Sequence, residues 1–137
     1  MNELKTGTVL QGGKYRIERV LGQGGFGITY MATQIALNRK VAIKEFFMKE
    51  LCNRDNTTSQ VSVPSIGSQD IVDRFRAKFV KEAQTIATLD NPHIIRIYDI
   101  FTENGTAYYV MDYIGGGSLT NIVEQDGPMS ESVAISF

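Results

Sequence analysis

The residues best suited to chemistry lie in three places along the 137-residue chain. Gly22, Gly24 and Gly27 fit the pattern G-x-G-x-x-G, in which missing side chains allow backbone N–H groups to approach phosphate oxygens. Lys44 ends the run Val-Ala-Ile-Lys, and Glu82 follows in a segment with helical spacing. An anion-binding turn followed by a cation indicates a site for a phosphate-containing ligand.

The glycine motif alone is equally compatible with a hairpin turn that binds nothing. A dinucleotide-binding site needs a helix directly after the glycines, whereas the residues that follow, Ile-Thr-Tyr-Met at 28–31, are typical of a strand. A P-loop needs a lysine after the last glycine, and none is present there. The sequence therefore predicts a glycine turn between two antiparallel strands.

Hydrophobic alternation and helical spacing predict an α+β fold, a five-stranded antiparallel sheet with one major helix. The helix carries an apolar stripe made of Ile71, Phe75, Phe79, Ile86 and Leu89. Asn104-Gly105 favours a two-residue hairpin turn between the last two strands. The five predicted strands are Tyr15–Leu21, Gly27–Thr33, Val41–Phe46, Ile95–Glu103 and Thr106–Tyr113.

Residues 47–68 interrupt this pattern between the third strand and the helix. The segment is rich in Asn, Asp, Thr, Ser and Gln, and it shows neither strand nor helix periodicity. We interpret it as a long mobile loop that hangs from the sheet; the alternative is a segment that regulates the helix.

Lys44 and Glu82 are candidates for an ion pair. Strand alternation places Lys44 on the same face as Ala42, and Glu82 lies on the apolar stripe of the helix, where a carboxylate needs a cation. Glu45 is the competing partner, but alternation turns it to the opposite face. A surface lysine on an edge strand is the alternative interpretation of Lys44.

Composition limits the classes of function. Hydrophobic residues make up 42% and charged residues 21%, as in an ordinary soluble domain. The formal net charge of -1 gives no reason to expect a nucleic acid or a membrane as partner. The single cysteine, Cys52, allows no internal disulfide, and the first residues contain no apolar signal segment, so we expect a cytoplasmic location.

The three motifs, in this order, resemble the N-terminal lobe (N-lobe) of a protein kinase. The stretch YRIERVLGQGGFGITY is most similar to bacterial, eukaryotic-like serine/threonine kinases, and the resemblance extends from about Tyr15 to Phe137. It implies an enzyme that transfers the γ-phosphoryl group of Mg-ATP to Ser or Thr hydroxyls of a protein substrate. Lys44 would position the phosphates and Glu82 would hold Lys44.

The resemblance also implies a set of nucleotide contacts. Met111 would be the gatekeeper, the carbonyl of Asp112 and the amide of Ile114 would bind adenine, and Ser118 would contact ribose. Without the resemblance, the sequence favours an ordinary buried strand for Met111 and its neighbours. Thr29 departs from the family's usual valine. The implied contacts are Leu21, Gly22, Gly24, Gly25, Phe26, Gly27, Thr29, Ala42, Lys44, Met111, Asp112, Ile114 and Ser118.

The catalytic H-R-D and D-F-G motifs of kinases do not occur in this sequence. We therefore expect an N-lobe at 1–114, with 47–68 as an insertion, followed at 115–137 by the hinge and the first helices of a truncated C-lobe. The chain alone should be inactive, and its magnesium ligands should lie outside it. Exposed lobe surface would favour a dimer. The alternative is a non-catalytic nucleotide-binding or scaffold module.

Overall fold

The described part of the chain contains the five predicted strands and the predicted helix. The computed structural model describes residues 3–55, 57–88 and 96–113, so the predicted C-lobe start at 115–137 lies outside it. Short 3-10 turns occupy Gln11–Gly13, Ile35–Leu37 and Ile66–Ser68. The strands and the helix are β1 (Val9–Leu10), β2 (Tyr15–Gln23), β3 (Gly27–Gln34), β4 (Arg39–Phe46), β5 (Asn53–Arg54), β6 (Val61–Ser62), α1 (Gln69–Ala87), β7 (Ile97–Glu103) and β8 (Thr106–Asp112).

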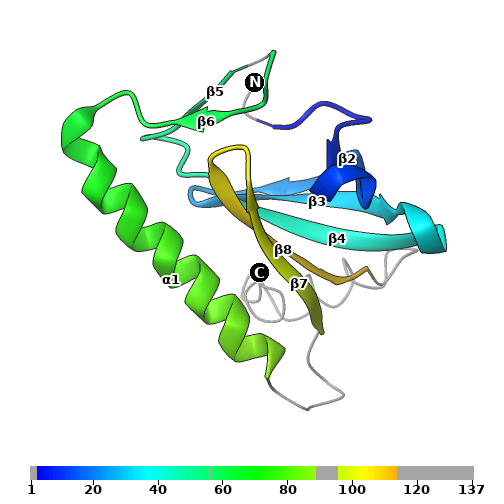
Figure 1. Cartoon of the computed structure of the whole chain (residues 1–137). Coiled ribbons are helices and arrows are strands. Elements are labelled where there is room, and N and C mark those ends of the chain that lie inside the picture. The colour runs from blue at the N-terminus through cyan, green and yellow to red at the C-terminus, as the bar shows by residue number, and fades with distance from the viewer. Residues whose placement is uncertain (1–2, 56, 89–95, 114–137) are drawn as a thin grey trace.

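Strand β4 lies inside the main sheet, whose order is β1-β2-β3-β4-β8-β7 with every neighbouring pair antiparallel (Figure 1). Lys44 of β4 lies opposite Thr29 of β3 and Tyr109 of β8. A slip by one residue would turn every side chain of β4 to the other face of the sheet. Pairing on both sides therefore fixes the face on which Lys44 lies. The predicted antiparallel sheet is confirmed, with the two-residue β1 as an additional edge.

The turn between β7 and β8 has the predicted hairpin form. Asn104 has a φ of 54° and Gly105 a φ of 74°, and a type I′ turn requires positive φ at both central residues. The carbonyl of Asn104 accepts a hydrogen bond from the Val61 amide at 2.8 Å. The turn thus holds the 47–68 segment as well as its own two strands.

Helix α1 crosses the sheet and contacts β7 and β8 (Figure 1). It buries Val72 and Ala83 and partly buries Phe75 and Phe79. The prediction that Ile71 belongs to the buried stripe is wrong, because its exposed fraction is 39%. Because an α-helix has 3.6 residues per turn, each step of four residues, from Phe79 to Phe75 and on to Ile71, rotates the side chain further from the centre of the stripe. Among the described residues, no helix is both long enough and apolar enough to cross a membrane.

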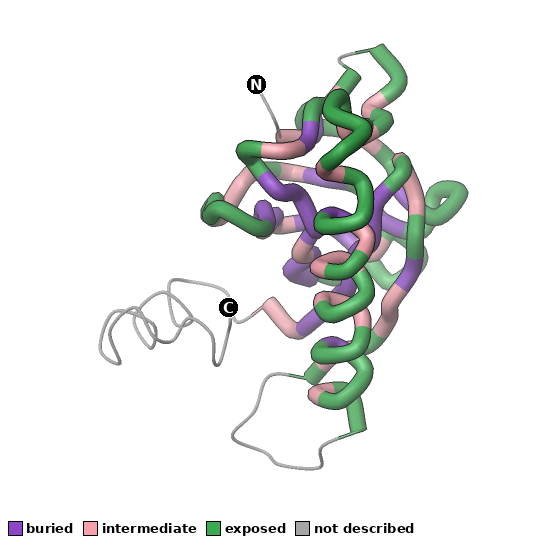
Figure 2. The backbone as a smooth tube through the Cα atoms, turned by 90° about the vertical axis from the view of Figure 1, so that its left-hand side faces the viewer, coloured by how far each residue is buried: buried purple, intermediate pink, exposed green. Residues whose placement is uncertain are grey.

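The sheet packs on both faces. One cluster contains Val41, Ile43 and Tyr108, together with Leu4 from the start of the chain. A smaller cluster lies between the other face and α1 and includes Ala42. Figure 2 shows the buried positions gathered in the strands, with the outer side of α1 exposed. Residues of β4 therefore alternate between two apolar environments.

Segment 47–68 packs against the sheet, so the prediction of a loop that merely hangs from it is wrong. Phe47, Met48 and Cys52 are buried, with exposed fractions of 1%, 7% and 4%. Strands β5 and β6 pair as a small antiparallel hairpin. Apolar residues without regular spacing give no periodic signal, yet they bury their side chains as effectively as periodic ones.

The close contact between this segment and the β7–β8 turn predicts that a methyl group added at Gly105 lowers the stability of the fold. A Cβ on Gly105 would lie 2.7 Å from the Val61 carbonyl oxygen, and the residue has positive φ. Gly12 also has positive φ, but a Cβ there would have nothing within 4 Å. We expect Gly105→Ala to lower the free energy of unfolding by about 2–3 kcal/mol and Gly12→Ala by about 1 kcal/mol. Urea denaturation measures both; equal losses would contradict the close packing of this turn.

Candidate functional site

The glycine turn joins β2 to β3 at one edge of the candidate site. The Gly24 amide donates to the Gly27 carbonyl at 2.9 Å and closes the turn. The carbonyl of Gly25 accepts from the Lys49 amide at 3.0 Å, and that of Phe26 accepts from the Phe47 amide at 2.9 Å. Backbone hydrogen bonds from the start of the 47–68 segment therefore fix the tip of the turn.

The glycines of this turn differ in what the fold requires of them. A Cβ on Gly27 would lie 2.9 Å from the Glu45 carbonyl oxygen and 3.3 Å from Cε of Lys44, so close packing requires a glycine there. A Cβ on Gly22, Gly24 or Gly25 would meet nothing within 4 Å, and none of these three has positive φ. Packing within the described residues therefore does not explain why those three positions lack side chains.

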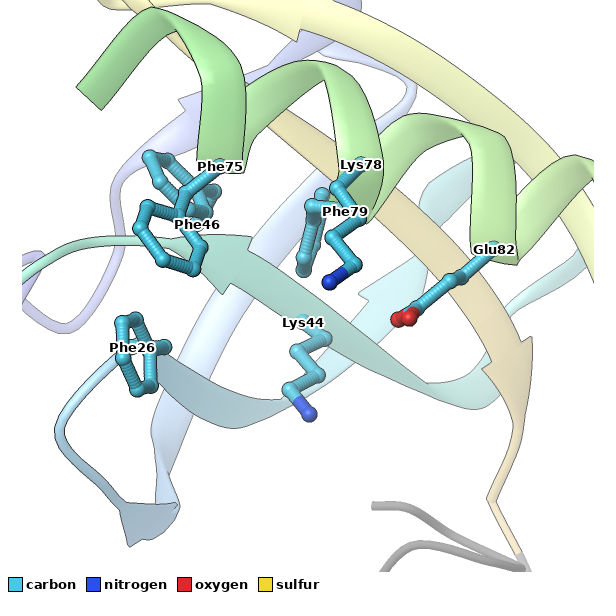
Figure 3. A pocket seen from close by; sticks show the side chains of 7 residues that line it. All are labelled: Phe26, Lys44, Phe46, Phe75, Lys78, Phe79 and Glu82. Carbon is cyan, nitrogen blue, oxygen red and sulfur yellow. The ribbon is translucent and has the colours of Figure 1, made fainter. Parts of the chain in front are cut away.

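Lys44 and Glu82 line one pocket of about 260 Å³ beside the glycine turn. Figure 3 shows both among the side chains that line it, Lys44 extending from β4 and Glu82 from α1, with Lys78 one helical turn before Glu82. The remaining lining residues are the four phenylalanines Phe26, Phe46, Phe75 and Phe79. The structure thus brings together the lysine, the glutamate and the glycine turn that the sequence singled out.

The expectation that Glu82 points into the core is wrong, because Glu82 is exposed and Lys44 is half-buried. The buried positions nearest to Glu82 along the stripe are Phe79, in part, and Ala83, so Glu82 lies at the edge of the apolar stripe. The ion pairs found within residues 3–55, 57–88 and 96–113 do not include one between Lys44 and Glu82. Their roles as phosphate-positioning and lysine-holding residues stay predictions.

Glu45 faces away from Lys44, as strand alternation predicts. Its carboxylate is fully buried and accepts hydrogen bonds from the hydroxyls of Tyr30 at 2.8 Å and Tyr108 at 2.5 Å, and it pairs with Arg54. Burial raises the pKa of both tyrosines, and the negative charge of Glu45 raises it further, so both hydroxyls keep their protons. Glu45 is therefore committed to the opposite face of the sheet.

Three of the predicted nucleotide contacts lie together. Ala42 and Met111 are buried in the cluster beneath α1, paired in register across β4 and β8, and Leu21 packs against the same cluster. Thr29 lies between Gly22 and Lys44 in the strand register. The structure thus gathers Leu21, Ala42 and Met111 in one apolar cluster.

Asp112 lies at the end of β8, as predicted, and its side chain is engaged within the sheet. The carboxylate accepts a hydrogen bond from the hydroxyl of Tyr98 and another from the Arg96 amide at 3.4 Å. The Asp112 amide donates to the Arg96 carbonyl at 3.1 Å. Ile114 and Ser118 lie outside the described residues.

Sequence reasoning missed Tyr109, which lies directly opposite Lys44. Its ring contacts that of Phe79 at 5.1 Å between centroids, and its exposed fraction is 8%. Burial raises the pKa of its hydroxyl, and the negative charge of Glu82 raises it further. Alternation along β8 from Met111 would have placed Tyr109 on this face.

Metal ligands are not gathered in the described part of the chain. Within residues 3–55, 57–88 and 96–113, no group of three or more His, Cys, Asp or Glu side chains is arranged to hold a metal ion.

Comparisons with known proteins agree with this geometry. The protein kinase domain family matches residues 15–137. The serine/threonine-protein kinase PrkC of Bacillus subtilis is 34% identical over 125 residues, which cover 91% of this chain and 16% of PrkC. PknB of Mycobacterium leprae, also a serine/threonine-protein kinase, is 33% identical over 128 residues, covering 90% of this chain and 18% of PknB.

Among solved structures, PpkA-294 in its apo form is similar, with a TM-score of 0.81 and 28% identity. The match covers 91% of this chain and 43% of that structure. The chain thus spans less than a fifth of the two curated relatives and less than half of PpkA-294. It belongs to the protein kinase family, and its curled antiparallel sheet with one main helix is the N-lobe of a protein kinase domain.

Proposed function

We propose that this chain binds ATP between the glycine turn and the pocket lined by Lys44 and Glu82. The observation that carries the proposal is the glycine turn itself. Three of its glycines have neither positive φ nor a neighbour that a Cβ would meet, so no side chain covers the backbone of the turn beside the pocket that Lys44 lines. A turn without side chains next to a cation suits the oxygens of a polyphosphate.

The surroundings of the turn fit the rest of the nucleotide. Leu21, Ala42 and Met111 belong to one apolar cluster, and we propose that adenine packs against it. Lys44 lines the pocket with an ammonium group, a type of donor that suits phosphate oxygens, and Glu82 lines the same pocket. In the proposed complex Lys44 holds the phosphates, Glu82 orients Lys44, and the turn covers the phosphates.

We further propose that the complete kinase transfers the γ-phosphoryl group of ATP to Ser or Thr hydroxyls of proteins, as the names of PrkC and PknB suggest for those relatives. Transfer needs an aspartate to accept the hydroxyl proton and another to bind magnesium. The sequence contains neither H-R-D nor D-F-G. The chain alone should therefore bind ATP without transferring its phosphate.

The first prediction tests Lys44. Replacing it with alanine removes a charged donor to phosphate, so ATP affinity should fall by roughly 10- to 100-fold. Lys40 provides the matched control, because it lies on the same strand but is exposed. Calorimetric titration of ATP into the wild-type chain, Lys44→Ala and Lys40→Ala measures the difference.

Equal affinities of wild type and Lys44→Ala would remove the assigned role of Lys44. If the wild-type chain does not bind ATP at all, the proposed function is wrong and a scaffold module takes its place.

The second prediction separates a phosphate cradle from a structural turn. A methyl group at Gly25 fits the folded chain, so Gly25→Ala should leave the free energy of unfolding unchanged or raise it by up to ~1 kcal/mol. The same methyl group would obstruct a phosphate and should lower ATP affinity on the order of tenfold. Gly67→Ala is the control, because its φ is not positive and its nearest neighbour would lie 4.0 Å away. Unchanged ATP affinity in a stable Gly25→Ala chain would contradict the cradle.

A further inference from the structure

A buried polar network lies behind the candidate site, on the face of β4 opposite Lys44. The Glu45 carboxylate at its centre is fully buried. The hydroxyl of Tyr30 donates to Oε1 at 2.8 Å and that of Tyr108 to Oε2 at 2.5 Å. The Leu4 amide donates to the Tyr30 oxygen at 2.9 Å, and Asn104 donates to the Tyr108 oxygen at 2.9 Å. Four separate parts of the chain therefore meet at one carboxylate.

The cation of this network comes from the 47–68 segment. Arg54 pairs with Oε1 of Glu45, and its side chain is only 3% exposed. It also donates to the Ser59 carbonyl at 2.8 Å, and its guanidinium lies 5.4 Å from the centre of the Phe47 ring. A charge buried this deeply is tolerated because the opposite charge is beside it. Glu45 therefore holds Arg54, and with it the segment, in one place.

The same segment is attached to the glycine turn at its other end. The amides of Phe47 and Lys49 donate to the carbonyls of Phe26 and Gly25, respectively. The ring of Phe26 packs against Phe75 of α1 at 5.4 Å between centroids. The stretch from Phe47 to Arg54 is thus fixed to the turn at its start and to Glu45 at its end.

We propose that Arg54 is a positioning residue for the nucleotide site. Its ion pair with Glu45 fixes the position of the Phe47–Arg54 stretch. In that position the Phe47 and Lys49 amides donate hydrogen bonds to the glycine turn beside the pocket. Because Lys44 and Glu45 are neighbours on opposite faces of β4, a rotation of the strand that moves one side chain also moves the other. This inference rests on the proposed binding of ATP at that pocket.

Arg54→Met in the full chain tests the proposal, since methionine keeps an unbranched apolar stem and removes the charge. We expect the Phe47 and Lys49 amides to exchange with solvent about tenfold faster and the Kd for ATP to rise about tenfold. The matched control is Arg16→Met, because Arg16 also pairs with a glutamate, Glu18, but is 46% exposed. The control should change neither measurement.

A second pair of variants keeps the test valid if Arg54→Met fails to fold, since Glu45 would then be buried without a cation. Arg54→Met combined with Glu45→Gln removes both charges and leaves an amide oxygen that can accept from one tyrosine hydroxyl and an NH2 group that can donate to the oxygen of the other. It should fold, yet still show faster exchange at Phe47 and Lys49 and weaker ATP binding. Arg54→Lys retains a cation and should recover part of the ATP affinity, which a loss of packing alone would not predict.

ATP binding by the double variant with wild-type affinity would overturn the positioning role while leaving the proposed function intact. Unchanged exchange at the Phe47 and Lys49 amides would overturn it as well. Absence of ATP binding by the wild-type chain would instead overturn the proposed function, and this inference with it.

Discussion

The burial of one carboxylate constrains much of this lobe. Glu45 is fully removed from solvent, and a buried charge requires both a counter-charge and hydrogen-bond donors. The donors are Tyr30 of β3 and Tyr108 of β8, the two strands on either side of β4, and the counter-charge is Arg54. The hydrogen bonds and the ion pair of Glu45 therefore fix three adjacent strands and the 47–68 segment relative to one another.

The buried network around Glu45 and the candidate site lie on opposite faces of strand β4. Alternation directs Lys44 toward the pocket beneath the glycine turn and Glu45 toward the buried network. The glycine at position 27 allows the two strands to approach closely at this point, since a Cβ there would meet both Glu45 and Lys44. A rigid polar interior on one face of the strand thus supports an open, partly solvated pocket on the other.

Much of the fold was predictable because its signals are local. Alternating strands, the Asn104-Gly105 turn and the spacing of α1 each depend on a few neighbouring residues. The glycine turn and Lys44 were predictable for the same reason. The environment of Glu82 was not, because its burial depends on where the stripe of α1 meets the sheet, and a small error in helix phase moves a side chain from core to solvent.

The role of the 47–68 segment could not be predicted from its composition. Its polar residues indicated a loop. Nothing in the sequence near Arg54 indicates that it pairs with Glu45, nine residues earlier. The pairing arises only when β4 and the segment fold back on each other. Ile114 and Ser118, two of the predicted nucleotide contacts, lie outside the described residues.

The network around Glu45 also has a consequence for the rate at which the lobe unfolds. Its hydrogen bonds join residues 26, 15 and 63 positions apart, so it is complete only after β3, β4 and β8 have assembled. We expect contacts between residues so far apart to form late in folding, to contribute little to the transition state and to act mainly by slowing unfolding. We expect this carboxylate to serve the lobe chiefly as a kinetic lock, which lengthens the lifetime of the folded state without hastening its formation.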